Sequence, residues 1–370
     1  MSPRVLFVSK PIAPPYHDGT KCLVRDVATH LERFEPIVMS VRGAEPPGAR
    51  VRAEPVYAGA GGFAPSLADN ARAALWLLTR SHSDVWHFVF APNPRTSMIG
   101  RTLSSLRRVP VVQTVASPPR SFEGLGRLLF GDVVVAQSRW TRERITEQGG
   151  GALRVEIIPP PVGALLARSA DATARVRHQL DISEGAPLFV YPGDLETSGG
   201  AEAVARCVAP LVQAHPDAVV VFAYREKTAA AARIAEALER RLRSPNVRLV
   251  RELPDVLALI SGARAVLFPV DDLHGKVDLP IVLLESMALG VPVVVLDHGP
   301  LAELEGATKV PLGDDAALVR VALAVSDDEA TRARTIEAAR AAIRRRYDAR
   351  VIAGAYERLY EELASRGRGA

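Results

Sequence analysis

A glutamate within an apolar helix is the first residue of this sequence that could do chemistry. The pattern of residues 265–299 predicts a strand, a loop, a helix and a second strand. Glu285 lies in the predicted helix, between the apolar runs Ile281–Leu284 and Met287–Leu289. A carboxylate is costly to bury unless a hydrogen-bond donor meets it, and the free N–H groups at a helix start suit a phosphate. This helix is therefore suited to a ligand with hydroxyl and phosphate groups, but the helix taken alone favours the alternative that Glu285 faces water.

The ends of this helix are marked by residues with known capping preferences. Asp278 is a suitable N-cap, and Pro280 suits the first helical turn. Gly290 followed by Pro292 ends the helix. The helix start should therefore face the loop that follows the strand at 265–270.

A second candidate for phosphate binding lies near the start of the chain. The strand Val5–Ser9 leads into a loop rich in proline and glycine, Lys10–Lys21, and then into a helix predicted for Cys22–Leu31. A strand that feeds a glycine loop and opens a helix is typical of mononucleotide phosphate sites. The loop has no GxGxxG pattern, so this stretch taken alone favours a plain turn at Asp18-Gly19.

Composition excludes several classes of protein. The 370 residues are 48% hydrophobic and 24% charged, typical of a soluble globular protein large enough for two cores. The apolar runs have strand length, so neither a membrane span nor a signal peptide is expected. The two cysteines, Cys22 and Cys207, are far apart and show no disulfide framework, which indicates a reducing cytoplasm. The eight histidines are scattered without metal-ligand spacing, so no metal site is expected. A net charge of +4 with few aromatics argues against nucleic acid and suits an anionic small molecule or membrane surface.

Strand and helix patterns alternate along the whole chain. Such alternation predicts parallel sheets with helices on both faces. A proline-rich stretch, Pro159–Pro161, separates two series of alternations. The predicted fold class is α/β, with two Rossmann-like, doubly wound parallel-sheet domains at residues 1–165 and 166–346 and a C-terminal helix at 347–370. A ligand is expected in the cleft between them, at the carboxyl ends of the strands.

Three stretches carry a resemblance to a known family. IVLLESMALGVPVVV (281–295) resembles the donor-site signature of the retaining glycosyltransferases of the GT-B fold, family 4 (GT4). Residues 116–150, with VEIIPPPV (155–162), resemble its interdomain region, and RRRYDARVIAGAYERLYEEL (344–363) resembles its closing helices. The resemblance implies a nucleotide-sugar donor in the C-terminal domain, an acceptor in the N-terminal domain and a last helix that packs back on the N-terminal domain.

The resemblance also assigns roles to single residues. Glu285 matches the second glutamate of the family's paired-glutamate motif, which binds the ribose hydroxyls, and Gly19 matches the glycine of a loop that faces the donor phosphate. His87 matches a family histidine at the end of an N-domain strand, and with Asp278 it is a catalytic candidate. The donor-binding candidates are Asp18, Gly19, Thr20, Gly193, Leu279, Pro280, Ile281, Val282 and Glu285, with Arg225, Lys227 and Lys276 as possible replacements for the family's phosphate clamp.

Several positions depart from the family pattern. Val277 stands where the first glutamate of the motif should fall, and Asp194 stands where an arginine of the phosphate clamp should be. The family's histidine that contacts the transferred sugar would fall near Ala116-Ser117. These departures put catalysis and donor identity in question but leave the fold expectation unchanged.

The expected function is transfer of a hexose from a UDP- or GDP-sugar with retention, without a metal or other cofactor. The partners are then the nucleotide sugar and an acceptor that is a sugar, a lipid-linked glycan or a small molecule, in the cytoplasm, including peripheral association with the inner face of a membrane. One alternative is a non-catalytic partner or regulatory subunit of the same fold. Another is a sugar-nucleotide epimerase, which would need a pair of acid/base carboxylates. Ser138 is not predicted to be a nucleophile, because GxSxG is absent.

Overall fold

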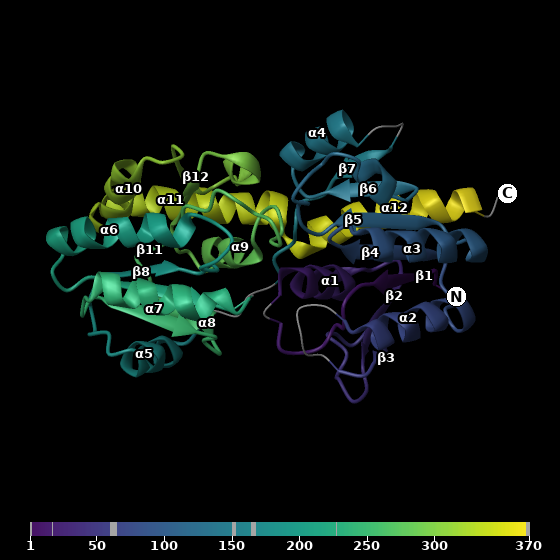
Figure 1. Cartoon of the computed structure of the whole chain (residues 1–370), viewed down its shortest axis with the longest axis horizontal. Helices are drawn as coiled ribbons and strands as arrows, with labels where there is room; N and C mark the ends of the chain where they lie inside the picture. The colour runs from purple at the N-terminus through teal and green to yellow at the C-terminus, as the bar shows by residue number, and fades with distance from the viewer. Residues whose placement is uncertain are drawn as a thin grey trace. The chain divides into compact units, whose positions relative to one another are not determined.

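The chain divides into two compact units. A computed structural model describes residues 2–16, 18–59, 65–149, 153–163, 168–226 and 228–367. Unit 1 comprises Met1–Gly163, His274–Ile281 and Arg346–Ala370, and unit 2 comprises Ala164–Leu273 and Val282–Arg345. Figure 1 shows the elements of both units. Every helix in the described part of the chain is too short or too polar to cross a membrane.

Unit 1 is built on a parallel sheet of seven strands. Their order is β3-β2-β1-β4-β5-β6-β7, and every described pairing is parallel. Buried apolar runs form most of these strands, as expected for a sheet that is covered on both faces. The strands are β1 (Arg4–Val8), β2 (Glu35–Val41), β3 (Arg52–Tyr57), β4 (Val85–Phe90), β5 (Val111–Val115), β6 (Val133–Ala136) and β7 (Val155–Ile157).

Helices cover the two faces of this sheet. Successive residues of a strand point to opposite faces: Val5 and Phe7 pack with α1 and α12, whereas Leu6 packs with α2 and α3. The helices of unit 1 are α1 (Gly19–His30), α2 (Leu67–Thr79), α3 (Pro94–Arg107), α4 (Arg139–Gln148) and α12 (Ala349–Gly367), with a 3-10 turn at Leu125–Leu128. The last helix of the chain therefore completes the core of the first unit.

Unit 2 has a parallel sheet of six strands in the order β10-β9-β8-β11-β12-β13. The strands are β8 (Leu188–Tyr191), β9 (Val219–Tyr224), β10 (Val247–Arg251), β11 (Ala265–Phe268), β12 (Val293–Leu296) and β13 (Thr308–Val310). The helices are α5 (Ala170–Gln179), α6 (Gly200–Ala214), α7 (Ala230–Leu242), α8 (Val256–Ser261), α9 (Ile281–Ala288), α10 (Asp315–Asp327) and α11 (Glu329–Ala342). Two short turns complete the list, a 3-10 turn at Gly299–Glu303 and a π-helical turn at Ile343–Tyr347 that joins α11 to the segment before α12.

The predicted fold class is confirmed: the protein consists of two parallel-sheet α/β domains. No helix or strand was predicted from sequence for residues 300–328. The structure has the edge strand β13 and helix α10 in this range. Short edge strands carry a weak periodic signal because they have few residues. The order of the strands also came only from the structure.

Candidate functional site

The switch point of the unit 2 sheet lies between β8 and β11. From β8 the chain moves to β9 and β10 on one side, and from β11 to β12 and β13 on the other. In open parallel sheets, ligands bind outside the carboxyl ends of the strands at such a point. Gly193 follows β8, Arg225 follows β9, and the loop that leads to α9 follows β11, so all three lie at this edge.

Two glycines allow the loop after β8 to lie directly against Tyr191. A Cβ atom at Gly193 would come within 2.4 Å of the Tyr191 ring, and one at Gly200 would come within 3.0 Å of the Tyr191 hydroxyl. That hydroxyl donates a hydrogen bond to the Asp194 carbonyl at 2.7 Å, and burial raises the pKa of Tyr191. Gly193 therefore keeps the backbone at the switch point close to the sheet.

Asp194, at the position where the resemblance implies an arginine, stabilises the turn of this loop. Its Oδ1 accepts hydrogen bonds from the Thr197 amide at 3.0 Å and the Thr197 hydroxyl at 2.6 Å. The neighbouring Asp271 accepts from the Gly199 amide at 2.8 Å. Asp194 thus places a carboxylate where the resemblance implies an arginine of the phosphate clamp. Arg225 is exposed at the same edge, whereas Lys227 lies outside the described residues.

Glu285 lies on the partly exposed side of α9. Leu283, Leu284 and Met287 have no exposed surface, whereas Val282 and Glu285, three residues apart, are both partly exposed. Residues three apart lie on the same side of a helix. The helix thus presents these two predicted donor-binding residues on one partly exposed side. Its contact with a ribose stays a prediction.

The switch point of unit 1 lies between β1 and β4, next to the predicted phosphate loop. The first helix starts at Gly19, and the Asp18 side chain caps it by accepting from the amides of Thr20 at 2.9 Å and Lys21 at 3.2 Å. Lys10 Nζ lies 2.9 Å from the same carboxylate. Asp18 therefore occupies the position that an anion would take at this helix start. Phosphate contact by Asp18, Gly19 and Thr20 stays a prediction.

The segment His274–Ile281 belongs to unit 1, although unit 2 residues flank it. The Val277 side chain lies over Gly19, where a Cβ atom would come within 3.3 Å of it. Asp278 is buried, and its Oδ2 accepts a hydrogen bond from Ser138 Oγ at 2.6 Å, while its amide donates to Gln137 Oε1 at 3.2 Å. The segment also holds Lys276, which is partly exposed, and Leu279, Pro280 and Ile281, which are buried.

His87 differs from its predicted setting. It was expected at the end of a strand, but it is the third residue of β4 and pairs with Phe7 and Val112 in the middle of the sheet. Its ring has no exposed surface, Nε2 lies 2.7 Å from Thr114 Oγ1, and Nδ1 lies 2.7 Å from the Tyr360 hydroxyl. Burial lowers the pKa of His87 to about 3, so the ring is neutral near pH 7. This is the arrangement of a satisfied core histidine, and the ring offers no surface for a catalytic contact.

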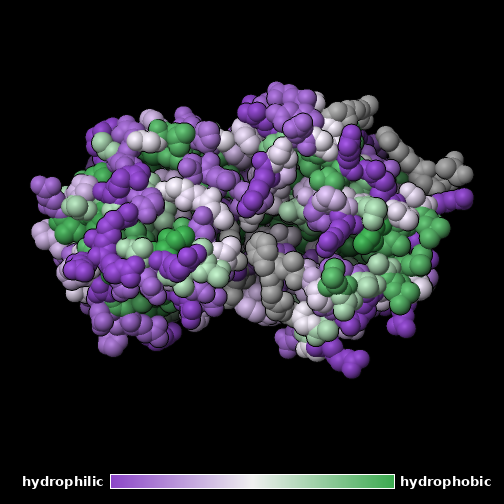
Figure 2. All heavy atoms as spheres, in the orientation of Figure 1, coloured by the Kyte–Doolittle hydropathy of each residue, from purple (hydrophilic) through white to green (hydrophobic). Residues whose placement is uncertain are grey.

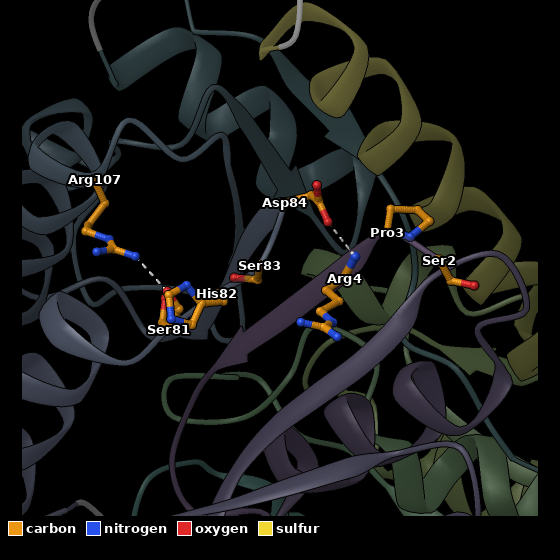
Figure 3. A pocket seen from close by; sticks show the side chains of 8 residues that line it. All are labelled: Ser2, Pro3, Arg4, Ser81, His82, Ser83, Asp84 and Arg107. Carbon is orange, nitrogen blue, oxygen red and sulfur yellow. Dashed lines mark hydrogen bonds between the residues drawn. The ribbon is translucent and has the colours of Figure 1, made fainter.

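A cavity lies at the other edge of the unit 1 sheet. Its volume is about 500 Å³, and it is lined by residues that include Arg4 at the start of β1 and Asp84 just before β4. Figure 3 shows the Arg4 amide directed at Asp84 and the Arg107 guanidinium directed at the Ser81 carbonyl. Because these are the amino ends of the strands, the cavity is opposite to the edge where parallel sheets bind ligands. It is not our candidate site.

No role at these sites was predicted from sequence for two residues that the structure places there. Ser138 is the N-cap of α4 and also donates to Asp278, and Lys10 pairs with Asp18. A serine directly after a strand and before a helix is a capping signal that can be read locally. The bond to Asp278 spans 140 residues of sequence and has no local signal.

The candidate site of unit 2 lies within a region that matches a known protein family. Residues 173–342 match the family "Glycosyl transferases group 1". This chain carries a glycosyltransferase group 1 domain. The domain runs from α5 to α11 and includes the β8/β11 switch point and Glu285.

Individual relatives are similar over different lengths. A phosphatidyl-myo-inositol mannosyltransferase of Mycobacterium leprae (strain TN) is 33% identical over 126 residues, which is 33% of each protein. The match therefore spans a third of that relative. Two solved structures are similar over nearly their whole length. Anabaena HepE in complex with UDP and glucose is 18% identical, with 98% of this chain and 99% of that chain covered and a TM-score of 0.73. A sucrose-phosphate synthase of Thermosynechococcus elongatus is 18% identical, with 99% of this chain and 100% of that chain covered and a TM-score of 0.75. At this identity they establish the fold.

Proposed function

We propose that this protein is a retaining glycosyltransferase of family 4 that transfers a hexose from a UDP- or GDP-sugar. The observation that carries the proposal is the glycosyltransferase group 1 match over residues 173–342, a region that includes the partly exposed Glu285 on α9 and Gly193 at the switch point. In this proposal unit 2 binds the donor and unit 1 binds the acceptor. The names of the M. leprae mannosyltransferase and of the Anabaena protein in complex with UDP and glucose are in line with such a donor.

The proposed chemistry uses residues of unit 2 at the carboxyl edge of its sheet. The Glu285 carboxylate accepts hydrogen bonds from the ribose hydroxyls. Departure of the nucleotide puts negative charge on the diphosphate, and the backbone at Val282 with the Arg225 guanidinium stabilises that charge. No metal ion is required in this scheme.

The test is incubation of the purified chain with a panel of UDP- and GDP-hexoses, followed by detection of released nucleotide and of any glycoside formed. We expect turnover of one donor, loss of that turnover in Glu285→Gln, and a product with the anomeric configuration of the donor by NMR. If no donor in the panel is transferred or hydrolysed, the proposal is contradicted.

One observation favours a second function, a non-catalytic binding partner of the same fold. Asp194 is 4% exposed and engaged in its own turn, and Val277 is 5% exposed and packed on Gly19. Neither can supply the charge that the resemblance implies at these positions. Nucleotide binding without any turnover would select this function.

A further inference from the structure

Helix α3 exposes three of its four large apolar side chains, and the fourth, Leu103, packs on the core. Its buried residues are small: Ser97, Gly100 and Ser104. A Cβ atom at Gly100 would come within 2.5 Å of the Phe130 ring, so small residues let the helix lie close on the domain core. Met98, by contrast, is 67% exposed, and Ile99 and Leu106 are exposed as well. This is the reverse of the usual amphipathic helix of a soluble domain.

Helix α2, which contacts α3, continues the apolar surface. Its Ala73 and Leu77 are buried in the core, whereas Leu67 and Leu75 are 75% and 61% exposed. We call the exposed apolar side chains of both helices, with the arginines described next, the α2–α3 surface. Figure 2 shows hydrophobic atoms gathered over these two helices. Contiguous exposed apolar surface on a domain commonly marks an interaction site.

The same surface is strongly basic. The two helices with their C-cap residues contain six arginines and a single acidic residue, Asp69, a formal charge of +5 against +4 for the whole chain. Arg80, Arg95 and Arg108 are exposed. The other three are engaged, because Arg72 pairs with Asp69, and Arg101 and Arg107 donate to backbone carbonyls. The positive charge of the chain is therefore concentrated where its apolar side chains are exposed.

We propose that the α2–α3 surface docks the protein onto an anionic lipid bilayer. Exposed apolar side chains flanked by arginines fit the boundary between acyl chains and anionic headgroups. A second copy of the chain fits less well, because a symmetric contact would bring two surfaces of charge +5 together. All the residues involved belong to unit 1, and the proposal does not depend on glycosyl transfer.

The test is co-sedimentation of the full chain with vesicles of phosphatidylcholine alone or with about one third phosphatidylglycerol. Three exposed arginines should raise the partition coefficient on the anionic vesicles by about a hundredfold at low salt. The double variant Met98→Ser/Leu106→Ser should lose about tenfold or more on them, because the apolar contribution is removed. Arg80→Gln/Arg95→Gln should lower anionic binding toward the level on neutral vesicles.

A matched control is Leu312→Ser/Val351→Ser, which removes two apolar side chains that are 55% and 47% exposed elsewhere. It should bind like the wild type. All the substituted side chains are exposed, so circular dichroism should show that the variants fold. Equal binding to neutral and anionic vesicles, equal loss in the control, or wild-type binding by the Met98/Leu106 variant would overturn the proposal. Self-association that depends on Met98 without vesicle binding would instead identify a protein–protein surface.

Discussion

Ser138 Oγ donates a 2.6 Å hydrogen bond to Asp278 Oδ2. Ser138 Oγ also accepts a hydrogen bond from the Thr141 amide and so caps α4. Ser138 and Asp278 are 2% and 0% exposed. One hydroxyl thus satisfies a helix end and a buried carboxylate in unit 1. This relationship fixes Asp278 within the His274–Ile281 segment of unit 1.

Ser138→Ala should lower the free energy of unfolding by about 2–4 kcal/mol. Loss of the cap costs about 1 kcal/mol, and leaving a buried carboxylate without this donor costs about 1–3 kcal/mol more. The measurement is urea denaturation. Ser169→Ala is the matched control, since Ser169 caps α5 at an exposed position and should cost about 1 kcal/mol or less. Equal losses in the two variants would mean that the bond to Asp278 contributes nothing.

Glu285→Ala should abolish the stabilisation of the protein by its nucleotide. A ligand at about one hundred times its dissociation constant adds roughly 2.7 kcal/mol, which appears as a clear rise in melting temperature. We expect the rise with either UDP or GDP in the wild type and none in the variant. Glu236→Ala, an exposed position on α7, is the control and should keep the full rise. An unchanged rise in Glu285→Ala would remove this residue from the site.

The buried His87 should make the protein less stable in mild acid. Its pKa is about 3 when folded and about 6.5 when unfolded, so below about pH 6.5 the unfolded state binds more protons. The contribution of the neutral His87 ring to the free energy of unfolding is therefore fully present above the unfolded pKa. It is lost progressively as the pH falls from about 6.5 to about 3. Linkage predicts a loss of about 2 kcal/mol between pH 7 and pH 5.

The control for this prediction is His87→Gln, whose loss over the same range should be smaller by that amount. An NMR titration of the wild-type ring tests the same point if the variant does not fold. A ring that titrates with a pKa near 6.5 in the folded protein would contradict the burial argument.

Glu357 should anchor α12 to the rest of unit 1. Its Oε1 accepts from the amides of Glu32 and Arg33, and its Oε2 accepts from Arg33 Nε at 3.0 Å. The side chain is 5% exposed, whereas that of Glu361, which pairs with the same arginine, is 45% exposed. Glu357→Ala should cost about 2–4 kcal/mol in chemical denaturation, because two backbone amides and the Arg33 guanidinium lose a buried, charged acceptor. Glu361→Ala should cost about 1 kcal/mol or less, and equal costs would rule out a special role for Glu357.

Local sequence patterns were sufficient for the two parallel-sheet domains and for most of their elements. Buried strands such as Val133–Ala136 are continuous apolar runs, and Gly290 with Pro292 ends α9 as expected. The capping of α1 by Asp18 could also have been read from its position directly before the helix. These signals are local because a strand or a helix is specified by residues within a few positions of one another.

Only the tertiary structure decided which of the candidate residues meet. It placed His87 in the core beside Tyr360, 273 residues away in sequence, where burial and hydrogen bonds remove it from any surface. It set Val277 on Gly19 and Asp278 on Ser138, and it gave Asp194 a role within its own turn. Such contacts depend on strand order and on the path of a returning segment, and no short stretch of sequence encodes either. The sequence by itself thus determined the two parallel-sheet α/β domains and the helix that carries Glu285, whereas packing decided which polar groups remain available for chemistry.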